Sequence, residues 1–284
     1  MPFQSGLPPH LNWLRKRSQS CKTACGKDIE VWDFSHGAQP EALSAWATHF
    51  RNHYCLDEQI DVMRGAKSRA EYLNELKFPT LSGGLGPATR AGDFGEILVA
   101  DFLQWILGFW VPRVRWSSKI IRNESPKGSD VIGFRIVSED GFSERDTLAI
   151  FETKTKFSAT TKNRLQDAIN DSAKDHIRLA ESLNFIKQKM LDRDQLEEVQ
   201  KVERFQSPAD FPYQEIYGAA EIMSSEFEDD QEFSQSTSLE VPMKPGSVEF
   251  APHPNRDNLK VIVISGLTMM QLVHNLYKLA ADEA

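Results

Sequence analysis

Residues 148–154 read Leu-Ala-Ile-Phe-Glu-Thr-Lys, an apolar run that ends in an acid and a lysine. Successive apolar residues followed by polar ones predict a strand buried in a sheet. Side chains alternate along a strand, so Glu152 and Lys154 are expected to point to the same face. A carboxylate and an ammonium group at the end of a buried strand are costly unless they pair, hydrogen-bond or bind a metal. The run therefore predicts either a salt-bridged strand end or part of a site.

A second strand is expected just upstream, over residues 129–137. Asp140-Gly141, a dipeptide typical of tight hairpin turns, separates it from the strand over residues 147–155. The numbers of cross-strand partners then sum to about 282, which places Asp130 opposite Glu152. Opposed carboxylates destabilise a sheet unless a cation lies between them, and Mg²⁺ is typically held by one or two carboxylates. A register shifted by one residue would instead point the two acids to opposite faces.

A third acid comes from the helix expected over residues 91–108. Glu96 follows Gly92 and Gly95 in that helix, and glycines at these positions suggest that the helix packs closely against a neighbouring element. Its position has two interpretations. It is either a favourable acid near a helix N-terminus or part of the same site as Asp130 and Glu152.

The remaining pattern predicts an α/β fold in which helices flank a mixed sheet. A loop rich in proline and glycine over residues 78–90 suggests a boundary between a mainly helical N-terminal extension, residues 1–89, and a domain over residues 90–284. Residues 207–241 give no clear assignment. Other expected strands cover residues 29–34, 111–121 and 259–265, and other expected helices cover residues 40–54, 57–76, 161–201 and 268–281, with breaks near Gly65 and Asp192.

Charge is unevenly distributed along the chain. The net charge is −8, from 33 basic and 41 acidic residues, which argues against a passive nucleic-acid coat protein. A single basic run is usually a solvated face, but two runs beside the same carboxylates predict a surface that contacts phosphate. Residues 226–232 form an acidic stretch that could mask such a surface. The basic residues near the candidate site are Arg122 and Lys127 in one run and Lys156, Lys162 and Arg164 in the other.

Other classes of site have little support in the sequence. Cys21, Cys25 and Cys55 are too few for a disulfide scaffold and fit a reducing cytoplasm, and together with His53 they offer only a weak zinc pattern. We find neither an apolar leader nor an apolar segment long enough to span a bilayer, so no membrane association is expected. Phosphate-binding Gly-x4-Gly-Lys, His-Glu-x-x-His and Gly-x-Ser-x-Gly motifs are absent.

The ordered set of Gly95-Glu96, Ser129-Asp130 and Glu152-Thr153-Lys154 resembles the PD-(D/E)xK nuclease superfamily, whose fold is restriction-endonuclease-like. The resemblance covers residues 91–171, and Ser129 replaces the proline of the superfamily pattern. Some members also carry a glutamine followed four residues later by a tyrosine, whereas here Gln166 is followed by Asn170. Gly-Glu-Ile-Leu at residues 95–98, Lys-Gly-Ser-Asp at 127–130 and Phe-Glu-Thr-Lys-Thr-Lys-Phe at 151–157 are similar to the HamA family, the nuclease subunits of the Hachiman anti-phage defence system.

The resemblance implies a Mg²⁺-dependent deoxyribonuclease, with Mn²⁺ able to substitute, that works in the cytoplasm with a HamB-like helicase partner. It implies that Asp130 and Glu152 bind the metal, that Lys154 orients the attacking water or stabilises charge on the phosphate, and that Glu96 helps to position the water or a second metal. The basic residues of the two runs would contact the DNA backbone without reading its sequence. The alternative is the same fold used as a non-catalytic module that binds DNA or a partner.

Overall fold

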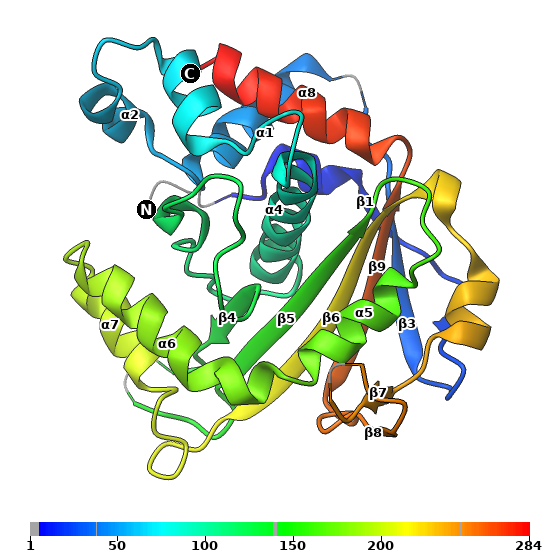
Figure 1. Cartoon of the computed structure of the whole chain (residues 1–284). Coiled ribbons are helices and arrows are strands. Elements are labelled where there is room, and N and C mark those ends of the chain that lie inside the picture. Colours follow the sequence, from blue (N-terminus) through cyan, green and yellow to red (C-terminus); the bar gives the residue numbers. More distant parts are fainter. Residues whose placement is uncertain (1–5, 38, 139–140, 245) are drawn as a thin grey trace.

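The computed structural model describes residues 6–37, 39–138, 141–244 and 246–284, and within them a seven-stranded mixed sheet forms the centre of the molecule (Figure 1). Its strand order is β1-β3-β9-β6-β5-β4, with β2 paired to β3. The predicted class, a mixed sheet flanked by helices, is confirmed. The sheet strands are β1 (Leu14–Lys16), β2 (Cys21–Lys22), β3 (Asp28–Phe34), β4 (Val131–Arg135), β5 (Thr147–Lys156), β6 (Gln214–Ser224) and β9 (Leu259–Gly266), and β7 (Glu240–Pro242) pairs separately with β8 (Phe250–Pro252).

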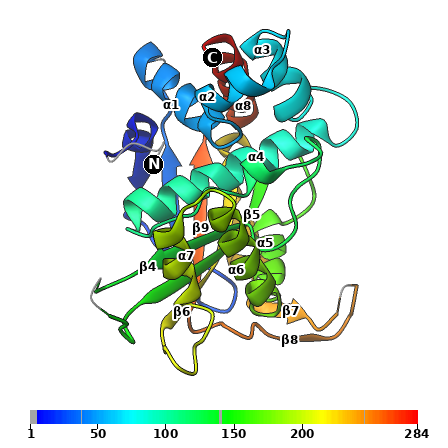
Figure 2. The same ribbon diagram turned by 90° about the vertical axis from the view of Figure 1, so that its left-hand side faces the viewer.

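Helices cover both faces of this sheet (Figures 1 and 2). One face carries α1 (Pro40–Asn52), α4 (Gly86–Asp101) and α8 (Met269–Asp282), and the other carries α5 (Arg164–Ser172), α6 (Asp175–Leu191) and α7 (Leu196–Glu203). The remaining helical elements are α2 (Asp57–Met63), α3 (Arg69–Tyr72), the short 3₁₀ helices η1 (Pro9–Trp13), η4 (Trp116–Ser118) and η5 (Ser225–Phe227), and the short π-helices η2 (Leu73–Lys77), η3 (Phe102–Ile106) and η6 (Glu232–Ser236).

Strand β5 is apolar without alternation because helices bury both of its faces. Ala149 and Phe151 pack into the core under α1, α4 and α8, whereas Leu148 and Ile150 pack into the core under α5, α6 and α7. β5 pairs antiparallel with β4 and parallel with β6, which the chain reaches through α5, α6 and α7. The expected hairpin of residues 129–137 and 147–155 is therefore present, although Glu139 and Asp140 of its turn lie outside the described residues.

Two expectations from the sequence need correction, and one region without an assignment is now defined. Residues 111–121, all of them described, form no strand. Pro112 has no N–H to donate to a β-ladder, and the side chains of Arg113 and Arg115 are buried. The pairing beside this segment is a single bridge between Trp110 and Phe134. Residues 161–201 form three helices rather than two, with a break between α5 and α6 in addition to the expected one near Asp192. Residues 207–241, which gave no assignment, contain the central strand β6.

The strands of the first 89 residues belong to the same sheet as the rest of the chain. β3 pairs in parallel with β9 from Ile29↔Val261 to Phe34↔Gly266, so the sheet continues across the expected boundary at residue 89. Before that position, more residues nevertheless lie in helices, chiefly α1, α2, α3 and η2, than in strands. A separate partner-binding role for residues 1–89 stays a prediction. Among the described residues, no helix combines the length and apolarity needed to cross a bilayer.

A buried carboxylate ties the N-terminal elements to the long helix α4. Asp101 is 0% exposed and accepts hydrogen bonds from His10 at 2.9 Å, His49 at 2.9 Å and Arg113 at 2.5 Å. The oxygen and nitrogen atoms of His49, His53 and Asp101 lie within 4.8 Å of one another, but the Arg113 guanidinium contacts both His53 and Asp101 and supplies the positive charge there. This set contains no cysteine, and the three thiols are free, so the weak zinc pattern is not assembled among the described residues.

Replacing Asp101 with asparagine should destabilise the protein by about 3–5 kcal/mol, because the buried guanidinium of Arg113 and the two histidines would lose the negative charge of the carboxylate that accepts their hydrogen bonds. Urea unfolding of the full chain measures this change. Asp282→Asn is the matched control, since Asp282 is half exposed and its ion pair with Lys278 contributes about 0–1 kcal/mol. Equal stabilities of the two variants would contradict the importance of the buried network.

Candidate functional site

Asp130 and Glu152 face each other where strands β4 and β5 open. Val131 pairs with Phe151, so the next pair along the ladder is Asp130 and Glu152, and the expected register is confirmed. Asp130 accepts hydrogen bonds from the backbone N–H of Thr153 at 3.1 Å and from Arg115 at 2.9 Å. Glu152 is 3% exposed and accepts a hydrogen bond from Arg178 at 3.0 Å. The two carboxylates therefore meet at a largely buried strand end.

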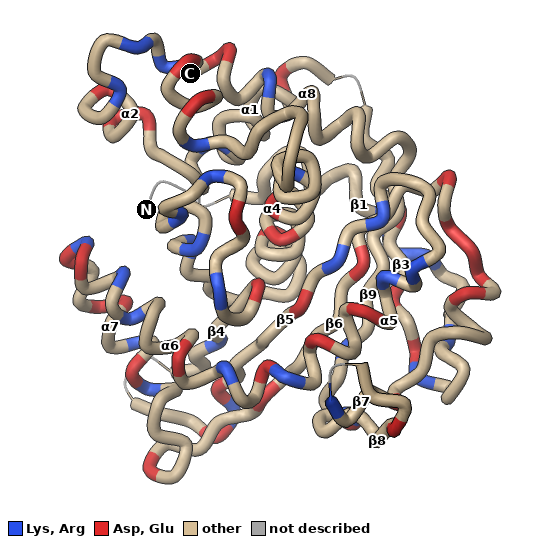
Figure 3. The backbone as a smooth tube through the Cα atoms, in the orientation of Figure 1, with Lys and Arg blue, Asp and Glu red and all other residues tan. Residues whose placement is uncertain are grey.

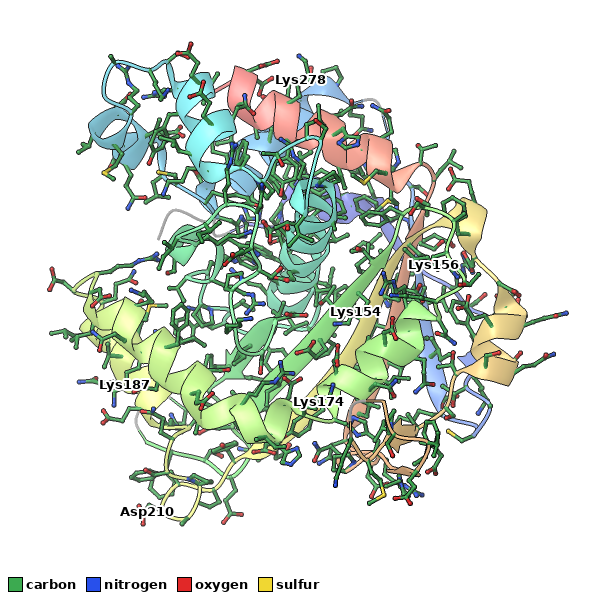
Figure 4. All side chains as sticks on the ribbon, in the orientation of Figure 1. Lys154, Lys156, Lys174, Lys187, Asp210 and Lys278 are labelled. Carbon is green, nitrogen blue, oxygen red and sulfur yellow. The ribbon has the colours of Figure 1, made fainter. Side chains whose placement is uncertain are left out.

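Lys154 (Figure 4) is two residues from Glu152 in β5, so the two side chains lie on the same face of the strand. Its Nζ is 3.7 Å from Glu152 Oε2 and 2.8 Å from Asp171 Oδ2. Burial opposes the charge of this amine, but Asp130, Glu152 and Asp171 outweigh it and raise the pKa of Lys154. The side chain is therefore held as an ammonium, suited to stabilising negative charge rather than to accepting a proton.

Glu96 reaches the same place from α4. It lies well beyond the first turn of that helix, which begins at Gly86, so its position is not explained as a favourable acid at a helix N-terminus. α4 approaches β5 closely at Gly95, where an added Cβ would lie 2.6 Å from the Thr155 side chain. Burial above all raises the pKa of Glu96 to about 8.

Three further residues complete the cluster and were not predicted from the sequence. Arg115 bridges two of the acids, with its Nε 2.9 Å from Glu96 and its terminal nitrogen 2.9 Å from Asp130. Asp175 and Arg178 come from the first turn of α6, and Arg178 contacts both Glu152 and Asp175. Arg115 precedes the basic residues Arg122 and Lys127 in the sequence, and no motif set it apart. Asp175 and Arg178 have the three-residue spacing of common surface ion pairs, so no sequence signal distinguished them.

The electrostatic state of the cluster favours a bound cation. Burial, followed by repulsion from Asp130 and Asp175, raises the pKa of Glu152 to about 10, and burial likewise raises the pKa of Asp175 to about 6. Within the described part of the chain, the buried Asp175 Oδ2 meets no N–H or hydroxyl donor. Crowded carboxylate oxygens of this kind suit a hard divalent cation such as Mg²⁺ or Mn²⁺. The residues present therefore fit a metal site, with Asp130 and Glu152 as its accessible carboxylates.

A cavity of about 810 Å³ opens onto the cluster. Acidic and basic residues alternate around it along β5 and the start of α6 (Figure 3). The charged residues lining the cavity are Glu96, Arg115, Lys127, Asp130, Glu152, Lys154, Arg164, Asp171, Lys174 and Arg178.

The basic residues expected to contact DNA fall into two groups, those in or beside the cavity and those held by other contacts. Lys127 and Arg164 line the cavity, and Lys162 is exposed two residues before Arg164. Arg122 instead donates a hydrogen bond to the carbonyl of Asn74 at 2.6 Å. Lys156 (Figure 4) is 6% exposed and pairs with Glu232. Neither Lys156 nor Arg122 is among the described residues that line the cavity.

The acidic stretch 226–232 packs near β9 and the residue that follows β1, toward the edge of the sheet that lies opposite β4. Glu228 pairs with Arg17 and accepts a hydrogen bond from Ser265 at 2.7 Å, and Glu226 accepts one from the backbone of Thr268 at 3.0 Å. Its contact with a predicted DNA-binding residue is the pair between Glu232 and Lys156. The stretch is therefore part of the folded structure. Any masking of the basic surface by this stretch would act through the ion pair between Glu232 and Lys156.

Glu152→Gln should stabilise the protein in EDTA by on the order of 1 kcal/mol, because it removes a carboxyl group that must take up a proton on folding or bury its charge beside Asp130 and Asp175. The gain should grow as the pH rises above 4.5, since the unfolded chain ionises Glu152 there while the folded protein resists ionisation until about 10. Thermal unfolding at several pH values measures it. Glu203→Gln, at a 62% exposed side chain, is the control. A Glu152→Gln variant no more stable than this control would contradict the description of the cluster.

Comparison with known proteins supports the family assignment. A family model described as HamA matches residues 8–280, nearly the whole chain. No curated protein matches the chain. The matched region includes the strands before residue 89 as well as the cavity residues. The chain therefore belongs to the HamA family and is a Hachiman defence-related protein.

Proposed function

We propose that this protein is a Mg²⁺-dependent deoxyribonuclease that hydrolyses phosphodiester bonds as the effector of an anti-phage defence complex. The observation that carries the proposal is the meeting of Asp130 and Glu152 across the β4–β5 hairpin with Lys154 on the same strand. Two carboxylates and an ammonium group at one end of a buried hairpin are suited to phosphodiester hydrolysis. The family assignment adds the context of phage defence.

In this proposal, Asp130 and Glu152 hold Mg²⁺ or Mn²⁺. When bound, the cation polarises the scissile phosphate and lowers the pKa of water. Lys154 keeps its proton and stabilises the negative charge that develops on the phosphate oxygens. Arg115 fixes Asp130 and Glu96 relative to each other through its hydrogen bonds to both, and this leaves Glu96 placed to orient a water molecule.

The basic residues at the mouth of the cavity position the DNA backbone. Lys127, Lys162 and Arg164 are the accessible cations of the two runs, and Lys174 adds to them from the start of α6. Lys127 lies in the segment before β4, whereas Arg164 and Lys174 lie at the starts of two different helices. Cations spread over separate segments, rather than along one helix, favour backbone contacts without base recognition. Arg122 and Lys156 would contact DNA only after Arg122 leaves the Asn74 carbonyl and Lys156 leaves Glu232.

A helicase of the HamB type is the proposed partner, and the cytoplasm is the proposed place of action. Both rest on the family and on its Hachiman context. The outer surface of the first 89 residues is the proposed docking region, because α2 and α3, which lie together beside α8 (Figure 2), contribute no described residue to the lining of the cavity. Exposed apolar side chains at Val62 and Met63 belong to this region.

The alternative function is a non-catalytic module that binds DNA or a partner. Two observations favour it: Arg115 and Arg178 already neutralise the carboxylates, and Glu232 engages Lys156. A binding module would retain DNA affinity when Glu152 or Lys154 is replaced, and would show no cleavage with any metal.

The purified chain should cut plasmid or linear DNA in Mg²⁺ or Mn²⁺ but not in EDTA, alone or with its helicase and ATP. Glu152→Ala and Lys154→Ala should each lower the rate by about 10²-fold or more, because each removes a group that stabilises the transition state. Lys187→Ala is the matched lysine control, because Lys187 lies on α6 far from Lys154 and pairs with Glu203 (Figure 4). Metal-dependent cleavage that survives both site substitutions would place the active site elsewhere.

Lys127→Ala should weaken DNA binding uniformly across sequences and lower the slope of log affinity against log salt by about 1, because one phosphate contact is lost. The measurement uses the Glu152→Gln background, in which cleavage is blocked, over a range of salt concentrations. Lys187→Ala in the same background should leave the slope unchanged. A slope unaffected by Lys127→Ala would remove this residue from the DNA-binding surface.

A further inference from the structure

We propose that Asp175 is a third carboxylate ligand of the divalent cation, beside Asp130 and Glu152. The inference rests on the proposed function and assigns a role to a residue outside the sequence motif. Asp175 is the first residue of α6, and it reaches the β5 strand end from the helical layer rather than from the hairpin.

A single cationic atom already lies between Asp175 and Glu152. One terminal nitrogen of Arg178 is 3.0 Å from Glu152 Oε1 and 3.2 Å from Asp175 Oδ1, and 3.3 Å from the carbonyl oxygen of Asp171. Three oxygens converge on this one atom, two of them from carboxylates. That convergence places Asp175 within reach of any cation that Glu152 holds.

Asp175 also has binding capacity that the protein does not use. The residue is 0% exposed, and its Oδ2 meets no N–H or hydroxyl donor among the described residues, although the carboxyl groups of Asp175 and Glu152 lie close enough to share a proton. The hydroxyl of Ser129 donates to Oδ1 at 2.8 Å and fixes the orientation of the carboxylate. A buried carboxylate oxygen without a partner is costly, and a divalent cation at the Glu152 carboxylate would remove that cost.

Arg178 is able to leave the position that a cation would take. It is 34% exposed on its side chain, lines the cavity, and has an Nε without a hydrogen-bond partner in the described structure. A rotation toward the cavity would uncover Asp175 and turn the guanidinium toward a bound phosphate, for which its planar donor geometry is well suited.

A purely structural role for Asp175 is the competing explanation. An acid in the first turn of a helix is stabilised by the helix dipole, and an Asp–Arg pair three residues apart is common on helix surfaces. That explanation suits an exposed pair. It does not account for complete burial, for the free oxygen, or for the approach to Glu152 of another element.

Mn²⁺ binding to the DNA-free full chain, followed by electron paramagnetic resonance, tests the proposal without any use of activity. Asp175→Asn should weaken Mn²⁺ binding about tenfold or more. Arg178→Gln should strengthen it, because a competing cation is removed. If Asp175 acted only by holding Arg178, the two variants would shift the affinity in the same direction. Asp192→Asn, at the exposed C-terminal end of α6, is the control and should bind as the wild type does.

Each outcome has a distinct meaning. Unchanged Mn²⁺ affinity in Asp175→Asn, with binding lost in Glu152→Gln, overturns the role of Asp175 and leaves the proposed nuclease intact. Absence of Mn²⁺ binding to the wild-type chain overturns both. Thermal unfolding establishes that each variant is folded. If Asp175→Asn does not fold, Arg178→Gln decides, and weaker Mn²⁺ binding by that variant contradicts the proposal.

Discussion

The burial of Glu152 at the end of β5 is the constraint on which the site depends. Helices cover both faces of this strand, so its polar end cannot be solvated as a surface carboxylate would be. Lys154 on the same strand and Arg178 on α6 lie beside Glu152, while Arg115 before β4 pairs with the neighbouring acids Glu96 and Asp130. In the proposed function, a bound divalent cation adds positive charge to this cluster of buried carboxylates.

The sequence predicted the part of the site that is local. A hairpin fixes its register through its turn, so the opposition of Asp130 and Glu152 followed from residue numbers alone, and strand alternation added Lys154. Arg115, Asp175 and Arg178 could not be found in the same way. Their roles depend on where an irregular segment and a helix pack against the sheet. Because residues 111–121 were expected to form a strand, the burial of Arg115 beside Glu96 and Asp130 was not predicted. Strand β6 was not predicted because Gly218 and Glu221 interrupt its apolar pattern. Gly218 is nevertheless required there, since the Phe151 ring lies against the backbone where a Cβ would be.

The N-terminal residues contribute to the same sheet and core that position the site. β3 extends the sheet beside β9, and Asp101 joins His10 and His49 to the helix that carries Glu96. Movement of these elements by a partner would therefore be transmitted to α4 through packed and hydrogen-bonded contacts. This coupling offers a physical route by which a partner on the outer surface could act on the proposed nuclease site.

Crystals of the full chain soaked in Mn²⁺ would test the central claim most directly, since anomalous scattering locates the metal without reference to activity. The account predicts an anomalous peak between the carboxylates of Asp130 and Glu152. A peak confined to the buried His49, His53 and Asp101 group, or no peak at the end of β5, would contradict it.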